Sequence, residues 1–212
     1  MYRSACLIIA FLSLLGSATS QNENDLWYFG NNAGLDFSLG YPVAVLDGAL
    51  VTADNTATVS DPITGELLFY SNGVKVWNRN HDVMPNGHGL LGNWSGGTSA
   101  IAVKLPGNNQ IYYLFTTDAF AWPNGLRYSI IDLELNNGLG DVTDQKNIVV
   151  QEISTEKVAI TKHANGVDYW IVTHPWNSDE YHVYRFNEQG LSQSPVISKI
   201  GLFHGGDSYN AM

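Results

Sequence analysis

Residues 157–172 read KVAITKHANGVDYWIV. A short strand of small and branched residues is followed by a tight turn at Gly166 and then by an aromatic strand. The same order occurs within 56–70, where the turn glycine is Gly65, and within 99–115, where it is Gly107. These glycines are 42 and 59 residues apart, near the ~40–50-residue period of β-propeller blades. The repeat therefore predicts propeller-like architecture.

Apolar residues alternate along these segments with a period of two, as in β-strands. Ile111, Tyr113 and Phe115 share one face, and the residues between them are also apolar, which is typical of strands buried on both faces. A further strand is predicted in each unit, at 75–77, 127–132 and 181–186. No stretch carries a helical apolar stripe over three turns. We predict an all-β fold of three- to four-stranded antiparallel blades.

The first twenty residues have the layout of a secretory signal peptide. Arg3 precedes an apolar run at Ala5–Leu15, and small residues at Ala18–Ser20 suit cleavage after Ser20. The run is shorter than the ~20 residues of a bilayer span. We therefore expect two parts, a signal peptide at 1–20 and a partial β-propeller at 21–212, and an exported chain without membrane insertion.

Composition excludes several classes of function. The chain has 20 Asp and Glu against 10 Lys and Arg, without a basic run, so it lacks the electrostatic footprint of nucleic-acid binding. Its single cysteine, Cys6, lies in the predicted signal peptide. The remaining residues therefore offer no thiol nucleophile, thiolate zinc site or iron–sulfur ligand.

Several segments resemble the propeller region of large secreted, gliding-motility-associated and adhesin-like proteins of the Bacteroidetes. They are Trp27–Phe37, Gly65–Gly73, Val76–Asn78 with Met84–Gly87, and Asp168–Trp170 with His174. The resemblance implies extracellular or cell-surface location linked to type IX secretion, with further modules and a sorting domain after the propeller. Without a sorting domain the expected location is periplasmic.

The chain departs from that pattern because it ends at Met212. At ~45 residues per blade, the part after the signal peptide amounts to roughly four blades. We therefore expect an incomplete, truncated propeller whose missing blades belong to a longer parent. A compact four-bladed ring is the alternative. Asn-Gly pairs, which occur five times, are predicted to form two-residue hairpin turns.

Weak candidates for binding are the aromatic rings and histidines of the loops. Trp94 and Trp122 lie in polar loops, and Trp176 follows the third aromatic strand. Exposed rings beside polar side chains suit stacking on sugars, whereas the competing interpretation is that they cap gaps between blades. Trp170, in mid-strand, is predicted to be core.

His163 and His174 flank the same strand and are the remaining binding candidates. Imidazoles at one rim could bind a metal or transfer protons, but no metal-binding spacing is present, and strand-end hydrogen bonding explains them more simply. No calcium loop, nucleophile elbow, phosphate loop or dinucleotide fingerprint occurs. We predict no metal, no cofactor and no catalytic residue.

The leading hypothesis is a non-enzymatic, exported propeller segment that binds protein or glycan at the cell surface. A secreted hydrolase or lyase acting on polysaccharide is the first alternative. The second is a fragment without independent function.

Overall fold

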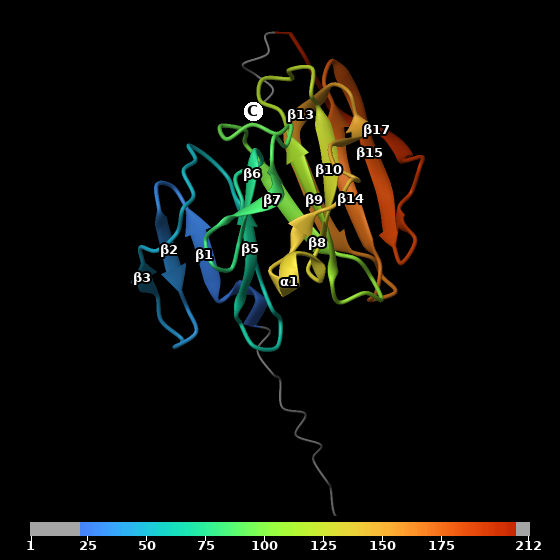
Figure 1. Cartoon of the computed structure of the whole chain (residues 1–212). Helices are drawn as coiled ribbons and strands as arrows, with labels where there is room; N and C mark the ends of the chain where they lie inside the picture. The colour runs from blue at the N-terminus through green and yellow to red at the C-terminus, as the bar shows by residue number, and fades with distance from the viewer. Residues whose placement is uncertain (1–21, 207–212) are drawn as a thin grey trace, which may run out of the picture.

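The computed structural model describes residues 22–206, and it confirms that the fold is all-β. Strands account for 51% of the chain and helices for 4%. The strands form four antiparallel sheets that follow one another along the chain and lie side by side in that order (Figure 1). The predicted signal peptide lies outside the described residues.

Consecutive strands pair within each sheet, except that the last strand of the third sheet and the last strand of the fourth sheet each pair with the strand two places before them. A 3₁₀ turn, η1 (Asn22–Asn24), precedes sheet 1, which contains β1 (Leu26–Phe29), β2 (Ala33–Asp36) and β3 (Val43–Val45). Sheet 2 contains β4 (Ala57–Ser60), β5 (Leu67–Ser71), β6 (Lys75–Asn78) and β7 (Val83–His88). Sheet 3 contains β8 (Ala100–Lys104), β9 (Ile111–Thr117), β10 (Leu126–Asp132), β11 (Asp141–Val142) and β12 (Ile148–Gln151). Sheet 4 contains β13 (Ser154–Lys162), β14 (Tyr169–Pro175), β15 (Ser178–Asn187), β16 (Gly190–Leu191) and β17 (Val196–His204).

The predicted strand–turn–strand repeat is confirmed as the pairs β4–β5, β8–β9 and β13–β14. Its turn glycines Gly65, Gly107 and Gly166 have φ values of 75°, 77° and 75°. This left-handed conformation is costly for residues with a Cβ atom. The glycine spacing therefore marked the beginning of three sheets.

The prediction for the Asn-Gly pairs was wrong in part. Asn86 and Gly87 lie inside strand β7 rather than in a turn. At α1 (Leu135–Gly138), Asn136 and Asn137 have φ values of 52° and 56°. This short segment is thus a left-handed turn and not a regular helix.

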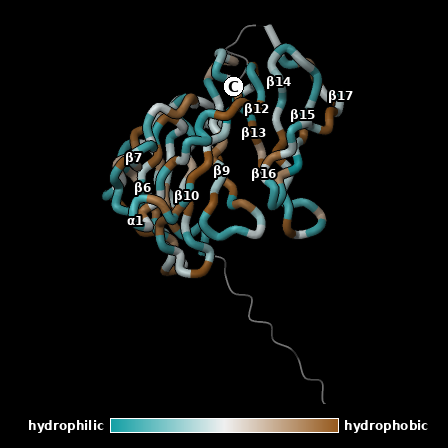
Figure 2. The backbone as a smooth tube through the Cα atoms, turned by 45° about the vertical axis from the view of Figure 1, so that its right-hand side comes forward, coloured by the Kyte–Doolittle hydropathy of each residue, from teal (hydrophilic) through white to brown (hydrophobic). Residues whose placement is uncertain are grey.

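The period-two alternation places successive side chains of β9 against different sheets. Leu114 packs with Phe69 of β5 in the core between sheets 2 and 3. Phe115, the next residue, packs with Ile171 and Phe186 in the core between sheets 3 and 4. Both faces of β9 are consequently buried, as predicted, and Figure 2 shows the apolar residues along it.

Sheet 1 packs on the remaining face of sheet 2. The Tyr28 and Tyr70 rings stack with centroids 4.9 Å apart, and Trp77 stacks on Tyr70 at 5.4 Å. The Tyr28 hydroxyl donates to Asp47 at 2.9 Å. Burial, together with the Asp47 carboxylate, raises the pKa of Tyr28, so its hydroxyl remains a donor.

Trp170 differs from its prediction as a core residue. It alternates with Ile171, which faces sheet 3, so its ring lies on the outer face of sheet 4. The ring is partly exposed there. The prediction failed because no sheet among residues 22–206 covers this face.

Candidate functional site

Trp94, Trp122, Trp176 and His174 lie at one end of the sheets, which we call the rim. The Trp94 loop precedes β8 and the Trp122 loop follows β9; because these strands are antiparallel, both loops reach the same end. Trp176 follows β14 and donates its backbone N–H to Ile153, just before β13. His163 joins the other ends of β13 and β14, so it does not belong to the rim.

A buried carboxylate ties the two tryptophan loops together. Glu156 of β13 is fully buried, and its Oε2 accepts the Gly97 N–H at 2.5 Å. Its Oε1 accepts the Phe120 N–H at 2.6 Å. A carboxylate out of water needs such donors, and here they come from one loop each. Glu156 therefore fixes the position of one loop relative to the other.

Asp118 stabilises the second loop from within. Its Oδ1 accepts the Ala119 N–H at 2.9 Å and its Oδ2 the Asn124 N–H at 3.2 Å. Between these contacts, Phe120 and Ala121 have φ values of 55° and 52°. Left-handed backbone costs non-glycine residues roughly 1–2 kcal/mol each, and strain of this kind gathers at functional sites. The Asp118 hydrogen bonds therefore help to stabilise a strained loop backbone.

The Trp94 ring is presented on a fixed backbone. Its carbonyl oxygen accepts hydrogen bonds from Thr52 Oγ1 at 2.6 Å and from the Ala53 N–H at 3.1 Å. The side chain nevertheless remains 52% exposed. The Ser95 hydroxyl donates to Asp54 beside it, at 3.3 Å. The rim thus offers an accessible ring next to a hydroxyl and a carboxylate.

Trp122 is exposed to nearly the same extent, 50%. Its ring packs against that of Phe120, with ring centroids 5.6 Å apart and tilted planes. Neither tryptophan is buried between two sheets as a capping residue would be. The exposure favours the binding interpretation over the capping one for both rings.

The histidines have separate surroundings. His174 is 5% exposed; its Nδ1 donates to the Pro175 carbonyl at 2.7 Å, and its Nε2 lacks a hydrogen-bond partner within residues 22–206. Its ring lies 4.7 Å from that of His204. His163 instead contacts the Trp170 ring at 4.9 Å, at the opposite end of sheet 4. Among the described residues, no three His, Cys, Asp or Glu side chains gather as metal ligands would.

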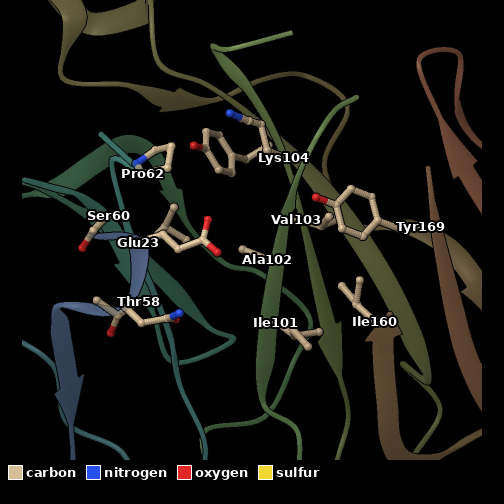
Figure 3. A pocket seen from close by; sticks show the side chains of 13 residues that line it. Glu23, Thr58, Ser60, Pro62, Ile101, Ala102, Val103, Lys104, Ile160 and Tyr169 are labelled. Carbon is tan, nitrogen blue, oxygen red and sulfur yellow. The ribbon is translucent and has the colours of Figure 1, made fainter. Parts of the chain in front are cut away.

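A groove of about 340 Å³ runs along the first strands of sheets 2, 3 and 4. Figure 3 shows Ser60, Ala102 and Ile160 around it, one from each of these strands. Glu23 and Lys104 supply charges, and the hydroxyls of Tyr112 and Tyr169 add polar groups. The groove could accommodate a small polar ligand.

Burial raises the pKa of Tyr112 to about 12, so this hydroxyl remains a hydrogen-bond donor in neutral solution. Glu23 is the only carboxylate among the residues that line the groove. Glycoside hydrolysis normally uses two carboxylates across the scissile bond. The groove as described does not provide that pair.

Glu156 was missed at the sequence level. Its neighbours Thr155 and Lys157 are also polar, and three consecutive polar residues at the beginning of a strand indicate exposure to solvent. Only the approach of the loops at 93–97 and 118–122 makes Glu156 a buried acceptor. The strand pattern carried no signal of that contact.

The chain matches no protein-family model, no curated protein and no solved structure. The resemblance to Bacteroidetes surface proteins therefore stays a prediction. Within residues 22–206, no helix is long and apolar enough to span a bilayer.

Proposed function

We propose that the chain is an exported, non-enzymatic interaction module that binds an extracellular glycan through the rim. The main observation in support is the pair of half-exposed rings, Trp94 and Trp122, on loops that both donate a hydrogen bond to the buried Glu156. Sugars have apolar faces that stack on aromatic rings and hydroxyls that need polar partners. Asp54, Asn55 and Ser95 lie close to the Trp94 loop and can supply them.

The proposal includes a finer architecture in which the four sheets are blades of a β-propeller. Each sheet is antiparallel, and sheets 1, 2 and 3 each pack face to face on the next one. The first strands of sheets 1, 2 and 3 are neighbours, since β1 contacts β4 and β4 contacts β8, while β13 of sheet 4 contacts β9 of sheet 3. Propellers arrange blades in this manner around an axis and bind partners at the loops of one end. Export is supported by the signal-peptide layout of residues 1–20.

A glycan array followed by titration calorimetry tests the proposal. Trp94→Ala and Trp122→Ala should each weaken binding of a glycan identified on the array by at least about tenfold, because each removes a stacking ring. Their unfolding temperatures should stay close to that of the native chain, because both side chains are half-exposed.

Trp27→Ala is the matched control, since Trp27 is also 50% exposed but lies in sheet 1, away from the rim loops. It should leave glycan affinity unchanged. Absence of binding to every glycan on the array would contradict the proposal. So would equal affinity of the native chain and both rim variants.

A further inference from the structure

The dipeptide Asn-Gly occurs five times in the chain, at Asn72, Asn86, Asn124, Asn137 and Asn165. An asparagine side chain loses its amide most readily in this dipeptide, because glycine has no Cβ atom to hinder attack of its backbone nitrogen on the asparagine Cγ. The attack requires a side-chain amide that is free to turn and room for the glycine backbone to move. Since the reacting groups are identical at the five positions, the fold decides which of them can react.

The side-chain amides of Asn72 and Asn86 are held through both of their polar atoms. Asn72 is 7% exposed; its Nδ2 donates to the Val51 carbonyl at 3.0 Å, and its Oδ1 accepts two backbone N–H groups. Asn86 Nδ2 donates to the Val142 carbonyl at 2.9 Å, and its Oδ1 accepts the Lys146 ammonium at 3.1 Å. Each amide would have to break these hydrogen bonds before it could react, so the fold protects both.

Asn165 is held in the same way although it is exposed. Its Oδ1 accepts the backbone N–H groups of Val167 and Asp168, both at 3.0 Å. Its Nδ2 donates to Asp168 Oδ2, also at 3.0 Å. The following residue, Gly166, has no atom within 4 Å of a Cβ placed on it. Exposure and an open glycine therefore do not by themselves free the amide.

Asn124 is protected through its glycine. Its side chain makes no hydrogen bond within residues 22–206, but the following Gly125 is buried. A Cβ atom on Gly125 would collide with the carbonyl oxygens of Gln151 and Glu152. The nitrogen that must approach the side chain of Asn124 is therefore enclosed by the backbone of another segment.

Asn137 combines an unbonded amide with open surroundings. Its side chain is exposed and makes no hydrogen bond in the described part of the chain, and a Cβ atom on Gly138 would meet no atom of another segment within 4 Å. Asn136 and Asn137 have φ values of 52° and 56° in the α1 turn between β10 and β11 (Figure 1). Asparagine normally adopts this left-handed region as a single residue, so two in succession favour local opening of the turn.

We propose that Asn137 is the site of spontaneous deamidation in the folded chain, with water as the only co-reactant. The Gly138 backbone nitrogen forms a bond to Asn137 Cγ and gives up its proton to water, and the side-chain nitrogen leaves as ammonia. Water then opens the resulting five-membered succinimide at one of its two carbonyl carbons. The net change converts an amide and water to a carboxylate and ammonium.

Opening of the succinimide gives two products that differ in the main chain. Hydrolysis at Cγ gives aspartate, whereas hydrolysis at the main-chain carbonyl carbon gives isoaspartate, with one additional methylene in the main chain. In the α1 turn the Leu139 N–H donates to the Asn136 carbonyl at 3.2 Å, and the Gly140 N–H to the Leu135 carbonyl at 3.0 Å. These bonds span residue 137, so isoaspartate should disrupt the turn, while aspartate adds only a negative charge.

Peptide mapping by mass spectrometry, on the full chain incubated at neutral pH, tests the proposal. Deamidation replaces an NH₂ group by an OH group, and electron-transfer fragmentation distinguishes isoaspartate from aspartate. Asn137 should deamidate at least about tenfold faster than Asn165, which is also exposed but must first break its hydrogen bonds. In urea that unfolds the chain, the rates at the five positions should become similar, because the fold no longer distinguishes them.

Asn137→Gly is the matched variant, since glycine adopts a φ of 56° readily and carries no side-chain amide. After incubation it should lack most of the acidic species that ion-exchange chromatography separates from the native chain. Asn165→Ser is the control and should leave the yield of these species unchanged.

Two results would overturn the proposal. The first is a rate at Asn137 in the folded chain no higher than that of another Asn-Gly pair. The second is an excess at Asn137 that persists in urea, because the local sequence would then be its cause. The readout is a mass and a charge, so it does not depend on glycan binding.

Discussion

Sheets 3 and 4 contain nearly the same sequence pattern but differ in what surrounds them. Strand β9 of sheet 3 has apolar residues on both faces, and both are buried against neighbouring sheets. Strand β14 of sheet 4 also has apolar residues on both faces over 169–172, yet Trp170 and Val172 remain partly exposed. The alternation of a strand therefore specifies which faces are suited to burial. Whether a face is buried depends on a neighbour.

The largest expected difference in the free energy of unfolding is between alanine variants of two phenylalanines. Phe115 of sheet 3 is fully buried, whereas Phe203 of sheet 4 is 64% exposed. Phe115→Ala should lower the free energy of unfolding by about 3–5 kcal/mol, since it leaves a cavity. Phe203→Ala should cost less than about 1 kcal/mol. Urea unfolding measures both, and equal losses would contradict the burial assigned to the two sheets.

Two carboxylates test how the surroundings of sheet 4 affect stability. The first, Glu156 of β13, contacts the loops before β8 and after β9 of sheet 3. Glu156→Gln replaces one acceptor by an amide N–H₂ that faces a backbone N–H. It should cost about 1–3 kcal/mol and speed hydrogen exchange in the loops at 93–97 and 118–122. Glu152→Gln, at an exposed position, is the control. Unchanged exchange in both loops would show that Glu156 does not hold them.

The smallest expected effect is a change in the pH dependence of stability, and it concerns Asp168, near the outer face of sheet 4. Hydrogen bonds from Arg185 and Asn165 and the Arg185 charge hold the pKa of Asp168 below its ordinary value of 3.8. The stabilisation is therefore present above the unfolded pKa and is lost as the pH falls through the lower folded pKa.

Thermal unfolding between pH 2 and 6 measures this loss. Asp168→Asn should have a flatter dependence on pH below about 3.8 than the native chain. Asp144→Asn, at an exposed position, should retain the native dependence. Parallel curves for the native chain and Asp168→Asn would contradict the role given to the Arg185 pair.

The candidate rim could be predicted from sequence only as separate parts. Loop composition identified Trp94 and Trp122 as exposed rings, and both are half-exposed. Sequence spacing did not place them at the same end, because that depends on which strands pair. It also grouped His163 with His174, although β14 separates them.

By itself, the sequence determined the strands and several of their turns. Alternation with a period of two and the glycines at left-handed positions are local properties, so an all-β chain with three strand–turn–strand units could be read directly. Only the tertiary structure decided which faces of the strands are buried and which distant segments contact each other. Gly125 and Gly166 have similar positive φ, but a Cβ on Gly125 would lie 2.2 Å from the Gln151 carbonyl, while Gly166 faces open space. Such differences arise between segments distant in sequence, and no local pattern encodes them.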